Sequence, residues 1–416
     1  MLVSPSSTTR DASQDVRVVV AESLAELKQF HAPWQDLASA AIEPNPFHEP
    51  WMLEPAAEFL GSEYDLRFVL ILAPGDPSYG TPMLLGFFPL ELRRSCGRYP
   101  ARTMCLWKHR YCFLSVPLLR EGYARQALGA FLDWLARNPF GCRIMRFETV
   151  TGDGPFHALL SELLEDRRRL NLMEERRVRA LLRRSESAEA YLDRAMSRKH
   201  LKDLQKRERR LAQLGRIGHV ALEPGADVEP WIADFLRLEE SGWKGRAGTA
   251  LAQQKPDAEF FRAIVRNAHR LGRLMMLGLC LEDKPIALKC NFLCGRGSFA
   301  FKMAYDESYA PYSPGLLVEV DNLKQVHAAP ALEWMDSCVG RRGSLMLDRF
   351  WTEHRVVETV LVSSGSRAGD FWILVIRLLR WMRRAWHVWR QKTLDPMASP
   401  APLEPVSART ARGGPA

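Results

Sequence analysis

Tyr312-Ser313-Pro314-Gly315 is the stretch that decides the fold of this chain. It follows residues 297–305, which alternate like a strand, and it precedes residues 316–326, which have the apolar spacing of a helix. A strand, a short loop and a helix start present free backbone N–H groups to an anion such as phosphate. We expect Ser313 to cap the helix, Pro314 to occupy its first turn and Gly315 to leave room for a ligand. The alternative is an ordinary helix start without a ligand.

The composition is that of a globular protein with an anionic partner. Of the 416 residues 47% are hydrophobic and 26% are charged, and the net charge of +9 suits a phosphorylated cofactor, nucleic acid or an acidic membrane face. The eight cysteines have neither Cys-x-x-Cys nor Cys/His ligand spacing, which predicts reduced thiols and no metal site. The N-terminus lacks the apolar stretch of a signal peptide, and no apolar run is long enough to span a bilayer. We therefore expect a cytoplasmic protein, with a peripheral position at the inner membrane as an alternative.

The first half of the chain alternates strands and helices after a disordered N-terminus at residues 1–15. Apolar alternation predicts strands at 66–73, 83–90 and 143–150, and the spacing of apolar residues predicts a helix over 122–137. These elements define a first domain over 16–185. A strongly basic helix follows, with seven Lys/Arg and two acidic residues between positions 198 and 210. It is either a solvated face or a patch for an anionic partner.

The second domain, expected over 186–366, repeats the plan of the first. Helices at 231–242 and 257–271 precede an antiparallel meander of three strands at 274–281, 286–294 and 298–305. A helix at 316–328 and a strand at 332–336 complete the half. The repeated order suggests a duplication, although the first half has Leu119-Arg-Glu-Gly122 where the second has Ser-Pro-Gly. The first half is thus expected to be degenerate.

The C-terminal tail differs from both halves. Residues 371–390 contain four Trp and five Arg, a composition typical of a helix that lies on an anionic membrane. The alternative is a terminal helix packed on the domain. We expect this helix over 367–392, followed by a disordered tail over 393–416 that is rich in Pro, Ala and Gly.

Five segments of the second half resemble the GNAT acyltransferase superfamily in their order and spacing. More closely, they resemble the CelD-type acetyltransferases of cellulose biosynthesis, which are related to the Fem peptidyltransferases. The segments are the basic helix at 198–211, Phe235-Leu-Arg-Leu-Glu-Glu-Ser-Gly-Trp-Lys-Gly-Arg-Ala-Gly-Thr-Ala-Leu251, Pro285-Ile-Ala287, Phe301-Lys-Met-Ala-Tyr-Asp-Glu-Ser-Tyr-Ala-Pro-Tyr-Ser-Pro-Gly-Leu-Leu317 and Asp336-Ser-Cys338.

The resemblance implies an α/β (α+β) fold with tandem GNAT-like domains, each a mixed, mostly antiparallel and splayed sheet flanked by helices. It implies that acetyl-CoA or another acyl-CoA lies beside the fourth strand of the second domain, with its pyrophosphate on the next helix. The residues that would bind it are Tyr312, Ser313, Pro314, Gly315 and Leu316. Family members usually carry Gln/Arg-x-x-Gly-x-Gly/Ala there, whereas this loop has one glycine and no Arg or Gln. A carrier-protein thioester is the alternative donor.

Acyl transfer requires a polarised thioester carbonyl, a nucleophile that loses a proton and a leaving thiolate that gains one. Tyr305, at the end of its strand, is our candidate for protonating the thiolate, with a packing role as the alternative. Asp336 is a candidate base or a loop cap. Glu240 is a further catalytic candidate, because it and Glu239 lie on a helix that would border the acceptor cleft, with one of the two facing solvent. Alternation predicts Phe299, Phe301, Met303 and Tyr305 on one face of the strand and Lys302 on the other.

The remaining candidates concern the acceptor. We expect Trp243 to wall the cleft and Lys244 to hold an anionic group, with Lys302, Asp306 and Trp351 as further substrate-binding residues. Asp306 has a turn cap as its alternative, and His354 near Trp351 is a weaker catalytic candidate. No Ser-His-Asp order and no nucleophilic cysteine context is present, so that we expect direct transfer without a covalent intermediate.

These observations lead to one main hypothesis and two alternatives. The main hypothesis is an acyl-CoA-dependent N- or O-acyltransferase that acetylates a sugar or another small metabolite, in polysaccharide or envelope biosynthesis. The first alternative is a non-catalytic, membrane-associated assembly factor for exopolysaccharide. The second is a Fem-like aminoacyl transferase whose helix at 198–210 contacts tRNA. No aromatic side chains interleave with that charge, which argues against a nucleic-acid partner.

Overall fold

The computed structural model describes residues 16–73, 82–137, 139–339 and 347–394. The chain divides into two compact units, residues 1–373 and residues 374–416. The predicted disorder at 1–15 lies outside the described residues, as does nearly all of the predicted tail at 393–416.

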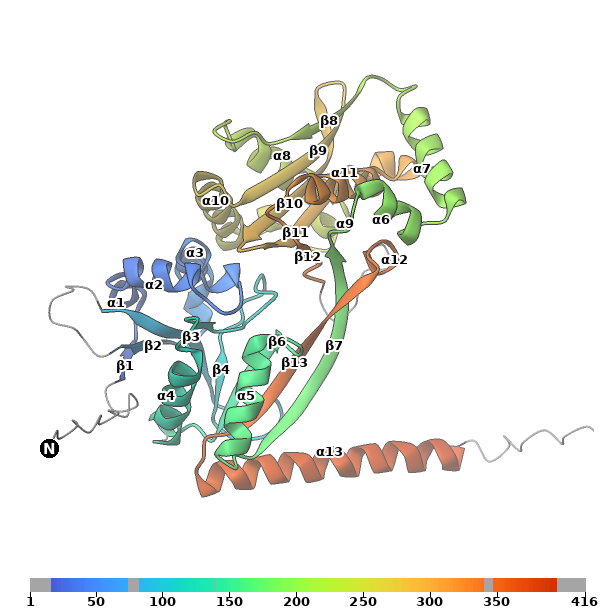
Figure 1. The fold of residues 1–416 in the computed structure, drawn as a ribbon. Coiled ribbons are helices and arrows are strands. Elements are labelled where there is room, and N and C mark those ends of the chain that lie inside the picture. The colour runs from blue at the N-terminus through green and yellow to red at the C-terminus, as the bar shows by residue number, and fades with distance from the viewer. Residues whose placement is uncertain (1–15, 74–81, 138, 340–346, 395–416) are drawn as a thin grey trace, which may run out of the picture. The chain divides into compact units, whose positions relative to one another are not determined.

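One sheet of 13 strands runs through the first unit and joins both halves of the chain (Figure 1). In spatial order its strands are β1 (Arg17–Ala21), β2 (Leu66–Leu72), β3 (Leu84–Arg93), β4 (Thr103–Leu106), β6 (Ile144–Thr151), β13 (Glu353–Ser363), β7 (Asn171–Arg183), β12 (Trp334–Asp336), β11 (Gly297–Tyr305), β10 (Lys284–Cys294), β9 (Leu274–Leu281) and β8 (Ile217–Ala221), with β5 (Leu118–Leu119) paired to β3.

The helices are placed along both halves of the sheet. They are α1 (Leu24–Lys28), α2 (His31–Ser39), α3 (Pro50–Leu60), α4 (Ala124–Ala136), α5 (Pro155–Asp166), α6 (Ala188–Ala195), α7 (Arg198–Leu211), α8 (Glu229–Ser241), α9 (Trp243–Arg246), α10 (Lys255–Arg270), α11 (Pro314–Ala328), α12 (Leu347–Phe350) and α13 (Arg367–Leu394). The predicted helices at 122–137, 231–242, 257–271 and 316–328 correspond to α4, α8, α10 and α11. The regular spacing of apolar residues gives each of these helices one face to bury, and this spacing can be recognised in the sequence.

The two halves repeat one plan, which confirms the predicted tandem architecture. Each half has an antiparallel meander, then a helix, then a strand that pairs in parallel with the last meander strand. Within the described residues, the parallel pairs are β4 with β6 and β11 with β12. The helix between the paired strands is α4 in the first half and α11 in the second. The same order of elements in the two halves corresponds to the repeated order predicted from the sequence.

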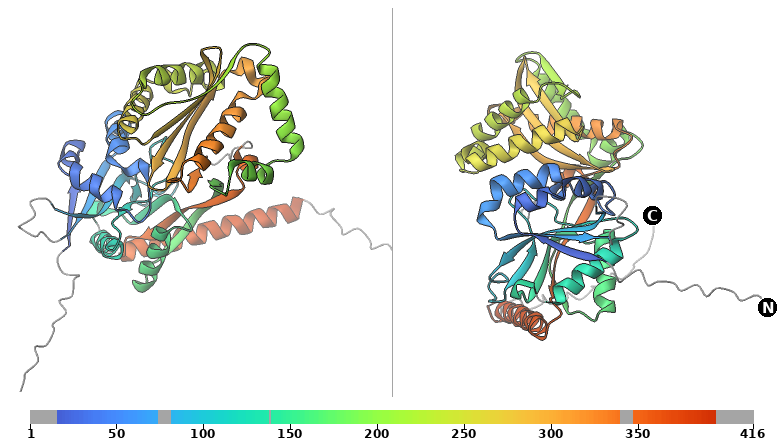
Figure 2. Two further views of the ribbon diagram at one scale, coloured as in Figure 1. Left: turned by 45° about the horizontal axis from the view of Figure 1, so that its top comes forward. Right: turned by 90° about the vertical axis from the view of Figure 1, so that its left-hand side faces the viewer.

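Two long strands that sequence analysis did not predict connect the halves. Strands β7 and β13 run antiparallel side by side, from the pair Glu353–Leu181 to the pair Val362–Asn171 (Figures 1 and 2). Strand β13 also pairs with β6 of the first half, and β7 pairs with β12 of the second. The late segment of the chain therefore returns to the middle of the sheet. His354, a weak catalytic candidate on sequence grounds, lies on β13 in this ladder.

The apolar core is also continuous between the halves. Phe47 of the first half packs edge-on against Phe299 of β11, and Phe113 packs edge-on against Phe301. Asn267 of α10 donates from its side chain to the carbonyl oxygen of Trp51 in α3, at 3.0 Å. All eight cysteines are buried free thiols, as predicted. Because both halves contribute to one core, neither is a separate globule.

The second unit consists of α13 from Leu374 onward. Its exposed apolar residues recur every three or four positions and therefore share one face: Leu374, Leu378, Trp381, Met382, Trp386 and Trp389. None of the helices in the described ranges combines the length and the apolar character that a bilayer crossing requires.

A buried carboxylate fixes the centre of the sheet. Asp336, at the end of β12, is fully buried between Arg179 of β7 and Arg355 of β13, at 2.7 and 2.8 Å. Its Oδ1 also accepts the Cys338 N–H at 2.9 Å. The two guanidinium groups and this hydrogen bond outweigh the cost of burial and lower the pKa of the carboxyl. Asp336 thereby links three strands from both halves.

We predict that Asp336→Asn destabilises the protein by about 3–5 kcal/mol, because it leaves two buried guanidinium groups without their counter-charge. Urea denaturation of the purified variant measures this change. Glu333→Gln is the matched control, because Glu333 stands three residues before Asp336 and pairs with Arg296 on an exposed surface, where such a pair should contribute less than about 1 kcal/mol. Equal stabilities for the two variants would contradict the assigned role of Asp336.

Candidate active site

The strands β11 and β12 part after three paired residues. Their parallel register runs from Gly297–Trp334 to Phe299–Asp336, where β12 ends. Strand β11 continues to Tyr305, and within the described residues no strand lies beside this edge beyond Phe299. The backbone N–H and C=O groups on that edge are therefore available to a ligand.

A β-bulge shapes the exposed part of β11. Lys302 is paired with Cys290 of β10, whereas Ala300 is paired with Asn291, so that Phe301 is an extra residue without a partner on β10. Because Cys290 and Asn291 point to opposite faces of β10, Lys302 and Ala300 also point to opposite faces. The bulge therefore turns Lys302 toward the face that α8 and α10 cover.

This bulge corrects the predicted alternation along β11. Phe301 stacks with Phe261 of α10, and Lys302 contacts Glu239 of α8, so that both lie on one face. Met303 and Tyr305 lie on the other face, since both approach Gly315 of α11. The prediction that Phe301 shares a face with Met303 and Tyr305, opposite Lys302, is wrong because simple alternation assumes a regular strand.

A cavity of about 480 Å³ lies where the strands part. One wall is β11 from Ala300 to Met303, and another is the chain that leaves β12, from Ser337 to Val339. Three lysines line it: Lys244, Lys289 and Lys302. The buried Ser337 hydroxyl, which also lines it, has no hydrogen-bond partner within the described residues. An unsatisfied buried hydroxyl facing a cavity is a group that a ligand can satisfy.

The first half of the chain supplies a further wall of this cavity. Arg110, Tyr111 and Phe113, from the segment between β4 and β5, line it. Asp257 of α10 holds this segment, because it accepts a hydrogen bond from the Tyr111 hydroxyl at 2.8 Å and from Arg110 Nε at 2.8 Å. The candidate site is therefore composite, which the sequence pattern of the second half alone does not indicate.

Glu239 carries the central charge of the site. Its side chain is 1% exposed, and its Oε1 accepts from Lys244 Nζ at 2.7 Å and from Lys302 Nζ at 2.8 Å. Its Oε2 accepts the Leu251 N–H at 2.9 Å. Although burial opposes ionisation, the two lysines lower the pKa of the Glu239 carboxyl. Glu240, the next residue on this helix, is exposed, so the structure favours Glu239 over our candidate Glu240.

Two further buried charges, Lys289 and Glu319, belong to the cavity wall. Lys289 of β10 pairs with Glu319 of α11 at 2.7 Å, and the indole of Trp351 donates to Glu319 at 3.1 Å. Trp351 is 1% exposed, so that it supports Glu319 from behind. The structure places it beside the predicted site but not on the surface of the cavity. Sequence analysis missed Lys289 and Glu319, since a lone charge in an apolar run gives no sign of its partner.

The loop before α11 meets the basic helix α7. Arg207 donates to the Ser313 hydroxyl at 2.9 Å, and the Arg210 guanidinium lies 5.7 Å from the centre of the Tyr312 ring. Helix α7 and the start of α11 are neighbours in Figure 2. The charge that is missing from the loop sequence is therefore supplied by residues about 100 positions earlier in the chain.

The predicted capping role of Ser313 is wrong. Ser313 precedes the helix in the left-handed conformation, with φ of 55°, and its hydroxyl makes no hydrogen bond to the first turn. The Gly315 N–H in that turn has no partner within the described residues. A Cβ at Gly315 would lie 3.2 Å from Met303, so this glycine also allows close packing on β11. A strained serine beside a free N–H group is typical of a ligand-binding loop.

The other candidates occupy the rim. Tyr305, Trp243 and Lys244 line a small neighbouring cavity of about 30 Å³. Trp243 is 58% exposed, and its predicted role as a wall of the acceptor cleft stays a prediction. Asp306 caps the turn after β11, because its carboxylate accepts the Ser308 N–H at 3.0 Å. Of its two predicted roles the cap is thus the one observed.

Asp336 does not fit the role of general base. Its carboxylate is fully buried between two guanidinium groups, which lower its pKa, and it caps the loop at Cys338. A general base works best when its pKa lies near the working pH. Its role is therefore structural. Of the two roles predicted for Asp336, base and loop cap, the structure shows the loop cap.

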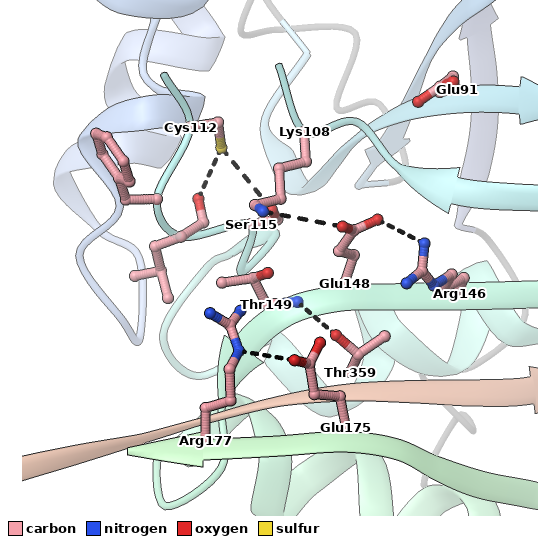
Figure 3. A network of polar contacts seen from close by, with 12 residues as sticks. Glu91, Lys108, Cys112, Ser115, Arg146, Glu148, Thr149, Glu175, Arg177 and Thr359 are labelled. Atoms are coloured by element: carbon pink, nitrogen blue, oxygen red, sulfur yellow. Dashed lines mark hydrogen bonds and ion pairs between the residues drawn. The ribbon is translucent and has the colours of Figure 1, made fainter. Parts of the chain in front are cut away.

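The equivalent place in the first half is filled by charged side chains. Strands β4 and β6 part after Cys105–Arg146, and Figure 3 shows the network beyond this point. Glu148 of β6 pairs with Arg146 at 2.9 Å and with Lys108 at 3.8 Å. Partners within the protein thus satisfy the charged groups there.

Comparisons with known proteins agree with this geometry. Residues 198–343, about a third of the chain, match the family model described as acetyltransferase (GNAT) domain. Among solved structures, the chain is similar to FemX, with 11% identity, 80% of this chain and 95% of that chain covered, and a TM-score of 0.52. No curated protein matches the sequence.

Two further solved structures show weaker likeness. A conserved protein of unknown function from Bacteroides thetaiotaomicron has 10% identity, with 83% of this chain and 99% of that chain covered and a TM-score of 0.48. A tandem GNAT protein from the clavulanic acid biosynthesis pathway has 12% identity, with 85% and 99% covered and a TM-score of 0.41. The family model identifies residues 198–343 as a GNAT-type acetyltransferase domain, and the likeness to FemX shows a related fold. Among the described residues no group of His, Cys, Asp and Glu is placed to hold a metal ion.

We predict that Glu239→Gln lowers the free energy of unfolding by about 3–5 kcal/mol, because a buried ammonium group loses its carboxylate. Glu240→Gln, one position along the same helix, should leave the stability close to that of the wild type, because Glu240 is exposed. Urea denaturation of both variants at pH 7 tests the contrast, and a stable Glu239→Gln variant would refute it.

Proposed function

We propose that this chain, a GNAT-superfamily acyltransferase, transfers an acyl group from acyl-CoA directly to an amine or hydroxyl of a small acceptor. The observation that carries the proposal is the parting of β11 and β12 over a cavity, with the first turn of α11 close to the same strand. In GNAT domains the splayed sheet receives the acyl-CoA, which here would lie along the free edge of β11. Acetyl-CoA is the simplest donor.

The phosphates of the donor would bind at the start of α11. The proposed ligands are the N–H group of Gly315 in the first turn and the guanidinium groups of Arg207 and Arg210. The Leu316 N–H donates to the Ser313 carbonyl oxygen at 3.0 Å, so Leu316 would border the phosphates without donating to them. Tyr312, Ser313 and Pro314 would form the loop that holds this turn. Because these two arginines lie against the loop, the basic helix is better suited to the cofactor than to a tRNA.

Backbone and side chains of β11 would carry the chemistry. Edge N–H groups of the strand would polarise the thioester carbonyl, and Tyr305 would protonate the departing thiolate. Cys338 lies on the cavity wall. Burial, and after it the negative charge of Asp336, raises the pKa of the Cys338 thiol well above its usual value, which supports direct transfer. A thiol that holds its proton this tightly is a poor nucleophile.

The acceptor would occupy the composite end of the cavity. Lys244 and the Ser337 hydroxyl are the proposed contacts, and Trp243 would close the rim. We propose a sugar or similar small metabolite, in polysaccharide or envelope synthesis, on the CelD-like sequence resemblance alone. The halves 16–185 and 186–366 would descend from a duplication in which the second half retained the donor site and the first became a wall.

We predict that acetyl-CoA or a longer acyl-CoA binds the purified protein. Isothermal titration calorimetry with a series of acyl chain lengths measures this binding and indicates the preferred donor. A folded protein that binds none of them would overturn the proposed function.

Within the same experiment, Arg207→Ala combined with Arg210→Ala should weaken acyl-CoA binding about tenfold or more, since a hydrogen bond to a charged group contributes about 1.5–3 kcal/mol. Arg209→Ala is the control, because Arg209 is exposed on the same helix and contacts only the Gln205 carbonyl oxygen among the described hydrogen bonds. Pantetheine, which lacks the phosphates of CoA, should bind both variants equally. Equal losses in the control and the double variant would exclude the assigned phosphate site.

We further propose that α13 contacts an anionic membrane surface. Its exposed apolar face contains three tryptophans, at 381, 386 and 389, each at least half exposed. Arg377, Arg380, Arg383 and Arg384 fall on the other side of the same helix. An apolar face with tryptophan beside a cationic face suits the boundary between headgroups and acyl chains.

We predict that the full-length protein floats with vesicles that contain phosphatidylglycerol and does so much less with phosphatidylcholine vesicles alone. Replacement of Trp381, Trp386 and Trp389 by Ala should abolish flotation, because it removes the apolar anchors, and it should leave acyl-CoA binding unchanged. Flotation that survives this replacement would refute the proposed face.

A further inference from the structure

The cavity contains more positive than negative charge. Its four cations are Arg110, Lys244, Lys289 and Lys302, and the carboxylates that pair with them are Asp257, Glu239 and Glu319. Arg110 has Asp257 and Lys289 has Glu319, whereas Lys244 and Lys302 share one oxygen of Glu239. One of these two lysines is therefore without a full counter-charge.

Lys302 is the less hydrated of the two. Its side chain is 12% exposed, against 23% for Lys244, and it projects from the middle of a strand. The Tyr111 ring lies 5.1 Å from its Nζ, the Arg110–Asp257 pair lies beyond this ring, and its partner on β10 is the buried Cys290. Burying a charged amine without its own carboxylate is costly, and loss of the proton removes that cost.

We propose that Lys302 is the general base of the transfer, its neutral amine accepting the proton of the attacking acceptor atom. This role rests on the proposed acyl transfer. Lys302 is suited to it because it lines the cavity and because it lies on the strand whose free edge would face the thioester. The bulge at Phe301 turns its side chain away from α11, so that base and phosphate site lie on opposite faces of β11.

The step balances without a further reactant. The nitrogen or oxygen of the acceptor attacks the thioester carbonyl and loses one proton to Lys302 Nζ. The bond from the acceptor to the acyl carbon forms and the carbon–sulfur bond breaks. The CoA thiolate takes one proton from the Tyr305 hydroxyl, and Tyr305 regains one from solvent. The Lys302 ammonium group returns one proton to solvent, which leaves the acylated acceptor, free CoA thiol, neutral Lys302 and protonated Tyr305.

The direction of the pKa shift agrees with this geometry. Burial lowers the pKa of Lys302, the charge of Lys244 lowers it further, and Glu239 acts in the opposite sense. A lowered pKa means that the amine is neutral at a pH at which an exposed lysine is still charged. Removal of Lys244 should therefore raise the pKa, and removal of the Glu239 charge should lower it.

Competitive labelling with trace acetic anhydride between pH 6 and pH 11 tests the proposal on the full-length protein. Mass spectrometry of peptides compares Lys302 with the exposed Lys324, whose side chain is 56% exposed. We expect the reactivity of Lys302 to rise at a lower pH than that of Lys324. In Lys244→Met the midpoint for Lys302 should move to higher pH.

Two results would overturn the proposal. Lys302 that titrates with Lys324 or at higher pH is a permanent cation, and Lys302 that is never labelled is inaccessible to an acceptor. The wild-type measurement is sufficient even if a variant fails to fold. Because labelling uses no acyl-CoA, a negative result here leaves the calorimetric test of the proposed function independent.

Discussion

The salt-bridged Asp336 carboxylate joins β12, β7 and β13 at the point where β12 leaves β11. Because β12 ends there, the rest of β11 has one edge without a neighbouring strand among the described residues. The cavity lies beside that edge. Trp334 reinforces the same place, because Arg355 lies 4.2 Å from its ring centre and the ring occupies the space where a side chain at Gly297 would stand. The charge cluster at the centre of the sheet and the candidate cavity therefore depend on the same strand end, that of β12.

Much of the second half was predictable because its signals are local. The meander β9–β10–β11 alternates over short distances, and α11 has regular apolar spacing, so residues near one another in sequence suffice to locate them. The pairing of β7 with β13 joins residues about 170–190 positions apart, and no local pattern specifies it. The fold class was thus accessible to sequence reasoning, whereas the way in which the two halves merge was not.

The candidate site shows the same division. The loop at Tyr312–Gly315 was found from its position between a strand and a helix, and Lys244 and Lys302 from their place in the resemblance. The choice between Glu239 and Glu240 depends on the helix face, and the direction of Lys302 depends on a single extra residue at Phe301. A bulge changes side-chain direction without leaving a mark in composition. Arg207 was seen as part of a basic helix, and only its contact with Ser313 relates it to the loop.

Division of labour between the halves has a consequence for how such a protein can diversify. Strand β11, to which we assign the transfer, and the segment with Arg110, Tyr111 and Phe113 lie about 190 positions apart in the sequence, yet they line the same cavity. Substitutions in that segment can alter which acceptor fits while the donor loop and β11 stay intact. Under the proposed function, the first half would serve as an exchangeable lining of the cavity. Recombination between the halves would then join the proposed acyl-transfer half to a new acceptor selectivity.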